Sequence, residues 1–501
     1  MSTELPQRRR ETHRAWVTGA LLLAMFMAAI EGTIVATAMP RIVSDLGGFS
    51  LYSWVFSMYL LTQVATIPIY GKLADQFGRK PVFLVGVSIF LVGSFLCGHA
   101  HTMLELIAFR TLQGIGSGAV QPIATTVVGD LYTAEERHRV QGWISSVWAV
   151  SAIFGPALGG FIVEYAHWAW IFYLNIPLGL VALAGLFLFL HEHVEHHAHA
   201  IDFPGALLLV VAIASFMVAV LQGGTAWSWA SPQSLGLLAV TIVGILLLVL
   251  WESRYKEPIL PMWLFRTPLI RVAGGTSFFN GALMLGYTAM IPTFVQGVLG
   301  GSALQAGFAL AVMSIGWPLA SFSSGPVMRA LGYKRMALLG GVLTVLAALE
   351  VWLTAHAGVG YIAAGVFVVG MGLGFLSNAL IITVQSVVPW QQRGVATANL
   401  MFMRTLGSTV GVAVAGAFLN LLLLRDLHGV TLPLAKGQHA IDLVNQLLNP
   451  EQRRGLAAIE APLVTALGSA LHGVFLVVLA FAVIGLVWSL RLPKNQTPAE
   501  S

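Results

Sequence analysis

The sequence predicts an all-α integral membrane protein: two six-helix bundles in a parallel pseudo-repeat plus an inserted two-helix hairpin, fourteen transmembrane helices in all. Three observations predict it, namely apolar runs of about 20 residues, a scarcity of charge and an internal repeat. Of the 501 residues, 57% are hydrophobic and 9% are charged, whereas a typical soluble domain has about 25% charged residues. Composition therefore excludes a soluble enzyme, a disordered chain and, with Cys97 as the one cysteine, a disulfide scaffold.

Each apolar run approaches the 20 or so residues that cross a hydrocarbon core of about 30 Å. An even number of spans puts both termini on one side of the membrane. Most of the 26 Lys and Arg residues lie in the termini and in the alternate loops on that side, so the positive-inside rule predicts cytoplasmic termini. The predicted spans are 15–38, 52–71, 82–98, 103–128, 141–163, 168–190, 204–222, 234–251, 272–296, 303–328, 335–355, 360–385, 394–420 and 468–490.

The internal repeat relates GKLADQFGRK (71–80) to GPVMRALGYK (325–334), an offset of 254 residues (325 minus 71). The same offset maps Gly78 onto Gly332 and Lys80 onto Lys334. Since eight predicted spans separate the two copies, both face the same side of the membrane. A parallel repeat of this kind is typical of two bundles related by an axis along the membrane normal.

The repeat predicts the domain organisation. A site between two bundles, opened alternately to each side, is the geometry of a secondary transporter. The predicted regions are a cytoplasmic N-terminus (1–14), an N-terminal six-helix bundle (15–190), a linker with two inserted transmembrane helices (191–270), a C-terminal six-helix bundle (271–490) that includes a long outer loop (421–467), and a cytoplasmic tail (491–501).

Glu31 is the main candidate for function because it is an acid inside the apolar run 21–40. A charged carboxylate at the centre of a span costs roughly 2.5–3.5 kcal/mol on insertion scales, and a buried carboxyl can hold a proton near neutral pH. A group that is charged in one state and neutral in another can couple proton binding to substrate binding. The alternative is that Glu31 only bonds a neighbouring helix.

Arg110 lies inside the fourth predicted span at a depth that matches Glu31. A buried guanidinium requires a carboxylate or several carbonyls. Glu31, and Glu105 on the same span as Arg110, are the two candidate partners. The pair is either a structural tie between helices or a means by which Arg110 sets the proton affinity of Glu31.

The predicted cytoplasmic loop 71–81 reads GKLADQFGRKP. Its glycines suit tight turns and its charges alternate in sign, so it can latch helix ends through ion pairs and a helix N-terminus. Asp130 ends the fourth span on the same face and is a candidate partner for Arg79. The alternative is an ordinary charged loop that only sets topology. The candidate gating residues are Gly71, Asp75, Gly78, Arg79, Lys80 and Asp130.

GPALGG (155–160) places a proline between glycines late in the fifth span. This pattern predicts a kink and a close approach by a neighbouring helix, that is, a packing hinge and not a ligand site. The residues concerned are Gly155, Pro156, Gly159 and Gly160.

Four motifs, EGTIVATAMP, GKLADQFGRKP, RTLQGIGSGAVQP and GPALGG, stand in this order. They resemble the first-helix signature and motifs A, B and C of the major facilitator superfamily, and the fourteen spans resemble its drug:proton antiporter subfamily of the EmrB/QacA type. The resemblance covers about residues 15–490 and implies the major facilitator fold and proton-driven efflux. It places Glu31 where the family carries an acid, commonly Asp, tied to proton coupling, and Arg110 at the motif B arginine implicated in proton transfer. In the second-half copy of motif A, Arg329 stands where the first copy has Asp75, so the latch is asymmetric.

The substrate cavity is predicted from polar and aromatic residues within the spans, which would suit amphipathic and cationic molecules. In each case ordinary packing between helices is the alternative. The candidates are Tyr59, Gln63, Gln113, Gln121, Trp148, Asn280, Tyr287 and Asn378.

Three further charged residues are weaker functional candidates. They are Glu164 and Glu350, near the outer ends of spans, and Arg404, in the middle of a span. The histidines of 191–199 predict a solvated linker more than a metal site, and the loop 421–467 predicts an interfacial segment.

We expect a proton-coupled secondary efflux transporter of the cell membrane that exports amphipathic drugs or toxic organic compounds. The alternatives are a dedicated exporter of one metabolite or lipid, and a membrane receptor or scaffold that does not transport. An enzyme is not expected, because no nucleophile triad or metal-ligand cluster stands in the spans. The expected partners are a small amphipathic substrate, protons and the lipid bilayer, with no nucleic acid, no cofactor, no metal and a monomeric state.

Overall fold

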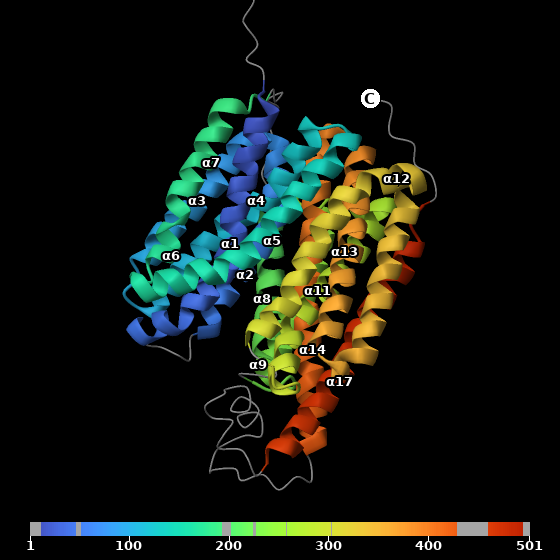
Figure 1. The fold of residues 1–501 in the computed structure, drawn as a ribbon. Coiled ribbons are helices and arrows are strands. Elements are labelled where there is room, and N and C mark those ends of the chain that lie inside the picture. Colours follow the sequence, from blue (N-terminus) through green and yellow to red (C-terminus); the bar gives the residue numbers. More distant parts are fainter. Residues whose placement is uncertain are drawn as a thin grey trace, which may run out of the picture. The chain divides into compact units, whose positions relative to one another are not determined.

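The structure is a computed structural model that describes residues 12–46, 52–192, 202–223, 227–256, 258–301, 303–427 and 459–493. Regular structure in these ranges is helical, apart from one isolated bridge between Gly223 and Trp227. Figure 1 shows the chain as long helices coloured from blue to red along the sequence. The helices are α1 (Arg14–Leu46), α2 (Tyr52–Phe77), α3 (Arg79–Gly98), α4 (Met103–Leu131), α5 (Ala134–Tyr165), α6 (Trp170–Tyr173), α7 (Asn175–Phe189), α8 (Phe203–Gln222), α9 (Pro232–Glu252), α10 (Trp263–Arg266), α11 (Pro268–Gly297), α12 (Ala303–Thr354), η2 (Ala355–Ala357), α13 (Val359–Val387), η3 (Trp390–Gln392), α14 (Arg393–Leu427) and α17 (Glu460–Leu490).

The predicted all-helical membrane fold is confirmed at this level. Within the described residues, 10 helical stretches are long and apolar enough to cross a membrane. The helix α12 holds two predicted spans, 303–328 and 335–355, which meet at a kink where Gly332 leaves helical geometry (φ 75°). The helices α2, α4 and α5 hold three more predicted spans, but their polar residues lower their hydropathy. The count of fourteen spans stays a prediction.

The chain forms two compact units. Unit 1 consists of Met1–Thr133, Val150–Ala206 and Trp390–Ala398, and unit 2 consists of Ala134–Ala149, Leu207–Pro389 and Asn399–Ser501. The helices α5, α8 and α14 therefore contribute residues to both units. The bundle boundaries expected from the sequence stay a prediction.

Residues paired by the 254-residue offset share local structure. Gly78, before α3, and Gly332, in α12, both have positive φ, 95° and 75°, which glycine adopts without steric cost. Lys80 Nζ donates to two carbonyl groups at the end of α7, both at 2.8 Å. Lys334 Nζ donates to two carbonyl groups at the end of α17. The repeated residues thus turn the chain and cap a helix C-terminus in each unit, although the two-bundle layout stays a prediction.

Candidate functional site

A buried ion pair joins α1 and α4 in unit 1. Glu31 is 0% exposed and Arg110 is 1% exposed, and Arg110 Nη1 donates to Glu31 Oε1 at 2.5 Å. Of the two partners expected for Arg110, the structure has Glu31. Glu105 instead accepts a hydrogen bond from the backbone N–H of His101 at 2.8 Å, at the start of α4.

Amide and hydroxyl groups complete the hydrogen bonding of this pair. Asn175 Nδ2, on α7, donates to Glu31 Oε2 at 2.6 Å, so each carboxylate oxygen has a partner. Arg110 Nη1 also donates to Gln113 Oε1 at 2.6 Å. Gln113 Nε2 donates in turn to Ser94 Oγ of α3 at 2.7 Å. Four helices thus hold the carboxylate and the guanidinium in one geometry.

An aromatic ring covers the guanidinium from the α2 side. The guanidinium carbon of Arg110 lies 4.1 Å from the ring centroid of Tyr59, a cation–π contact. The Tyr59 hydroxyl bonds Ser117 Oγ at 2.7 Å, and Gln63 Nε2 donates to the same oxygen at 2.9 Å. We define the Glu31 network as Glu31, Tyr59, Gln63, Ser94, Arg110, Gln113, Ser117 and Asn175.

The Glu31 network can exist in two charge states. With Glu31 ionised, its charge balances that of Arg110. With Glu31 protonated, Arg110 stays charged because a guanidinium keeps its proton in proteins. Arg110 then retains the Gln113 oxygen and the carbonyl of Val55, which accepts from Nε at 3.4 Å. A proton on Glu31 therefore changes the charge of this site by one while most of its hydrogen bonds remain.

A second charged cluster surrounds Arg79, at the start of α3. Arg79 Nη2 lies 2.9 Å from Asp75 Oδ1 of α2, and Arg79 Nε lies 3.2 Å from Asp130 Oδ2 of α4. The contact between Arg79 and Asp130 was one that the sequence predicted. The guanidinium also stacks on Trp390, at 3.9 Å from the ring centroid, and Nη2 donates to the Trp390 carbonyl at 2.7 Å.

Asp75 caps the N-terminus of α14. Its carboxylate accepts hydrogen bonds from the backbone N–H groups of Gly394 at 2.9 Å and of Val395 at 2.7 Å, where the helix dipole favours negative charge. Burial nevertheless raises the pKa of Asp75 from 3.8 to about 7, against the opposing effects of Arg79 and of the two N–H groups. Gly71 lets α2 approach this helix end, since a Cβ there would meet Ala398.

Asp130 ties the same helix end to α4. Its Oδ1 lies 3.2 Å from Arg393 Nη1, at the first residue of α14. Burial raises the pKa of Asp130 as well, opposed by Arg79 and Arg393. Two acids whose pKa values lie above their ordinary range therefore hold one helix N-terminus.

Glu192 is a member of this cluster that the sequence reasoning missed. Its two carboxylate oxygens accept the backbone N–H groups of Arg79 and Lys80, each at 3.0 Å, and so cap α3 just after Gly78. Glu192 Oε1 also lies 3.8 Å from Arg79 Nε. Its signal in the sequence is an acid directly after the sixth predicted span.

A pocket of about 260 Å³ lies beside this cluster. Its lining is mixed in charge, so it selects no single class of ligand. The lining residues are Arg79, Val127, Asp130, Leu131, Leu190, His191, Glu192 and Trp390.

The glycines of 155–160 bring α5 against α1. A Cβ at Gly155 would meet the side chain of Thr33, and one at Gly159 would lie 3.0 Å from the carbonyl oxygen of Ile34. A Cβ at Gly160 would meet nothing within 4 Å. The expected close approach is present at two of the three glycines, while the side chain of Pro156 lies outside the described residues.

The predicted cavity residues divide between the two units. Tyr59, Gln63 and Gln113 belong to the Glu31 network, and Gln121 is half-buried on α4. The other four lie in unit 2, in separate settings. Trp148 is 44% exposed, and Asn378 Nδ2 donates to Ser324 Oγ at 3.0 Å. Asn280 and Tyr287 are buried, and among the described residues the Asn280 Nδ2 and the Tyr287 hydroxyl group have no hydrogen-bond partner.

Sequence reasoning also missed Asn175 and Ser94. Asn175 is a lone amide in the apolar stretch 170–189, a signal of the kind that identified Glu31. Most of the histidine-rich segment, at 193–199, and most of the outer loop, at 428–458, lie outside the described residues.

Comparison with known proteins gives a consistent result. Residues 21–412 match the sequence profile of the Major Facilitator Superfamily. The chain is 33% identical over 516 residues to the multidrug transporter protein MdtP of Bacillus subtilis, an alignment that covers 98% of this chain and 95% of that protein. It is 36% identical over 417 residues to multidrug resistance protein 3 of the same bacterium, covering 81% and 80%.

A solved structure shares the fold. The human organic anion transporter MFSD10 (TETRAN) aligns with a TM-score of 0.62 at 15% sequence identity, covering 94% of this chain and 100% of that chain. At this level of identity the likeness concerns the fold alone.

Proposed function

We propose, from the premise that this chain belongs to the Major Facilitator Superfamily, that it is a proton-coupled antiporter that exports amphipathic compounds. The chain is a multi-pass membrane transporter with multidrug transporters among its relatives. The observation that carries the further step to proton coupling is the Glu31 network. It places one carboxyl group that can take a proton against one guanidinium that cannot lose its own.

The proposed mechanism is competition between a proton and the substrate. When the site faces outward, Glu31 takes a proton, loses its attraction for positive charge and releases the substrate. When the site faces inward, Glu31 loses the proton and the substrate binds again. Arg110 and Asn175 support this cycle because each holds one of the two carboxylate oxygens of Glu31 in place.

The cluster around Arg79 provides the proposed latch for the conformational step. The helix α14 leaves unit 1 after Ala398 and continues in unit 2 from Asn399. Movement of α14 away from unit 1 would break the two N–H bonds to Asp75 and the contact between Arg393 and Asp130. Because burial in this contact raises the pKa of Asp75 to about 7, loss of the Asp75 proton favours release of the helix, so proton binding and helix position are coupled at this point.

The membrane potential supplies energy for this cycle when the substrate is uncharged, because one proton then carries one net charge per cycle. Exchange of one proton for one cation moves no net charge and depends on the pH gradient alone. One charge moved down 100 mV is worth about 2.3 kcal/mol. At about 1.4 kcal/mol per decade, one net charge per cycle sustains a roughly fiftyfold substrate gradient. No cofactor and no nucleic acid enter this proposal.

The remaining features of the proposal follow the sequence. They are fourteen spans of the drug:proton antiporter type, both termini in the cytoplasm, a location in the cell membrane and a monomeric state. The Lys and Arg asymmetry supports the orientation. The two multidrug relatives support a broad substrate range more than a single dedicated metabolite.

The test is exchange in proteoliposomes with ethidium, an amphipathic cation, as the probe. We expect an imposed pH gradient to drive ethidium movement by the wild type, and Glu31→Gln to lose at least tenfold of this rate. The matched control is Glu164→Gln, an exposed acid on α5. If Glu31→Gln retains pH-driven exchange, the coupling role assigned to Glu31 is wrong.

A competition panel decides the substrate range. Unrelated dyes and biocides should compete with ethidium if the protein is a multidrug exporter. If a pH gradient drives neither ethidium nor any member of the panel, the broad range is refuted and a dedicated exporter takes its place.

A further inference from the structure

Arg404 of α14 is a charged side chain of unit 2 that has no partner. It is half-buried, and its guanidinium makes no hydrogen bond or ion pair with any described residue. A guanidinium keeps its charge in proteins and offers five N–H donors. Ionisable residues within spans are costly, and they mark binding sites or transport pathways. The charge of Arg404 therefore requires an explanation that packing does not give.

Arg404 lies on the face of α14 that packs against α11. A Cβ at Gly407 would meet the carbonyl group of Phe278 in α11, and one at Gly411 would meet Ala282. Positions 404, 407 and 411 share one face of the helix, because they are three and four residues apart. The side chain of Arg404 thus starts on a face that another helix covers, and not on a face turned to lipid.

The adjacent part of α11 has a second donor without a partner. A Cβ at Gly281 would meet the carbonyl oxygen of Arg404, so these two residues lie side by side. Asn280, which precedes Gly281, is 7% exposed, and its Nδ2 is buried with no hydrogen-bond partner in the described part of the chain. The guanidinium nitrogens of Arg404 are not buried in this way, so a ligand can reach them.

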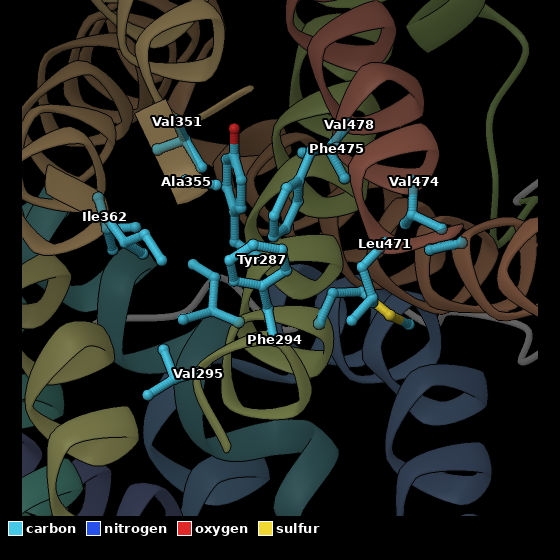
Figure 2. Close-up of a cluster of buried hydrophobic side chains, with 14 of the residues drawn as sticks. Tyr287, Phe294, Val295, Val351, Ala355, Ile362, Leu471, Val474, Phe475 and Val478 are labelled. Carbon is cyan, nitrogen blue, oxygen red and sulfur yellow. The ribbon is translucent and has the colours of Figure 1, made fainter. Parts of the chain in front are cut away.

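The neighbouring core of unit 2 is apolar. Figure 2 shows Tyr287 of α11 and Phe475 of α17 in this core, among aliphatic side chains. The core includes Leu283, shortly after the contact with Arg404 on α11, and Ala415, further along α14. Arg404 therefore lies at the edge of an apolar region, an arrangement that suits a molecule with one charged and one apolar end.

The internal repeat supplies no acid for Arg404. The 254-residue offset maps Glu31 and Arg110 of unit 1 onto Leu285 and Ala364 of unit 2. The buried ion pair of unit 1 thus has an apolar counterpart in unit 2. A partly buried cation that its own chain does not neutralise is well suited to bind an anion from outside.

We propose that Arg404 binds the anionic group, a carboxylate or a sulfonate, of an amphipathic compound. The guanidinium can hold a carboxylate through two parallel N–H···O bonds. A phospholipid headgroup does not fit this position, because Arg404 lies ten residues (404 minus 394) inside the predicted span 394–420, about 15 Å from its end. The inference rests on the proposed function in that the compound is cargo, and it adds anionic compounds to the substrate range.

The test is a binding measurement that needs no transport. Purified full-length protein in nanodiscs of zwitterionic lipid is dialysed to equilibrium against naphthalene-2-carboxylate or its neutral counterpart, naphthalene-2-carboxamide. We expect the wild type to bind the carboxylate about tenfold more tightly or better, since its hydrogen bonds to Arg404 are charge-assisted. Arg404→Gln should lose this preference and keep its affinity for the carboxamide.

The matched control is Arg425→Gln on the same helix. The side chain of Arg425 is 73% exposed and pairs with Asp426, so this variant should keep the preference for the carboxylate. Equal affinities of the wild type for the two probes overturn the site, and so does an Arg404→Gln protein that retains the preference.

A measurement on the wild type decides if Arg404→Gln does not fold. Phenylglyoxal modifies guanidinium groups that water reaches, and mass spectrometry of peptides identifies the modified residues. Naphthalene-2-carboxylate should slow the modification of Arg404 and leave that of Arg425 unchanged. An unchanged rate at Arg404, or no modification of Arg404 at all, overturns the site. Failure of pH-driven ethidium exchange would refute proton coupling and leave these binding results intact.

Discussion

The buried pair between Glu31 and Arg110 makes a quantitative prediction. Removal of one partner from a buried ion pair typically costs about 3–5 kcal/mol. In Glu31→Gln the amide nitrogen faces the Asn175 donor, so that one hydrogen bond is lost. The amide oxygen can still accept from Arg110, and this remaining bond limits the loss of stability. We therefore expect the low end, about 3 kcal/mol. At about 2–4 °C per kcal/mol for a unit of this size, the melting temperature should fall by about 6–12 °C.

Arg110→Gln should cost less. The remaining Glu31 carboxyl keeps Asn175 and can become neutral by taking a proton, whereas an orphaned guanidinium cannot lose one. We expect about 1–3 kcal/mol. In the double variant no buried charge remains, so its loss should be smaller than the sum of the two single losses by at least about 1 kcal/mol.

The assay is thermal unfolding of the purified protein in a mild detergent, with all four members of the cycle measured together. The matched control is Asp45→Asn, which removes one partner of the pair with Arg41 on the same helix. That pair is exposed and should contribute only about 0–1 kcal/mol. Additive losses in the double variant would refute the reasoning, because they would mean that the two charges do not act on each other.

Three further predictions concern packing, pH and the latch. Gly155→Ala should lower the free energy of unfolding by about 1–3 kcal/mol, because its new Cβ meets α1. Gly160→Ala should leave stability unchanged, because a Cβ there meets nothing within 4 Å. A lower melting temperature for Gly160→Ala than for Gly155→Ala would contradict this reasoning. Because burial raises the pKa of Asp75 from 3.8 to about 7, its contribution to stability is complete below about pH 4 and is lost as the pH rises to about 7. The melting temperature of Asp75→Asn should therefore depend less on pH between about pH 4 and pH 7 than that of the wild type. If the two curves of melting temperature against pH run parallel, Asp75 is not the group responsible. Glu192→Gln should lower the melting temperature, because it weakens the cap of α3 and so costs about 0.5–2 kcal/mol of stability. The control Glu164→Gln should leave the melting temperature unchanged. Equal effects of the two variants would show that Glu192 does not stabilise α3 as a cap.

Polarity and depth were sufficient to predict the centre of the candidate site. Glu31 and Arg110 are charges in apolar runs at matching depth, and two such charges have few other ways to be satisfied. The same argument found Asp130 for Arg79, since both were placed on one face by the topology. The helices were predictable because apolar runs of this length have one stable form in a bilayer.

The remaining contacts depend on side-chain packing that sequence spacing does not encode. Asn175 reaches Glu31 only because α7 packs on α1 and α3. Glu192 meets the start of α3 from a position 113 residues away. The predicted cavity residues show the same limit, because an amide or an aromatic ring in a span serves packing and binding equally well until its neighbours are known. Tyr287, for example, lies in an apolar core, which its place in the sequence does not show.

The hydrogen-bond partners divide the acids of this protein by what a proton would do at each. Glu31 holds a guanidinium within unit 1, so a proton there changes the charge of one internal site. Asp75 holds the N-terminus of a helix whose later residues belong to unit 2, and burial there raises its pKa, so loss of its proton favours release of an element that both units share. A carboxyl that only balances a charge is suited to exchange a proton for a substrate, whereas a carboxyl that caps a shared helix is suited to register a conformational step. We therefore propose coupling for Glu31 and gating for Asp75, although both are buried acids beside an arginine.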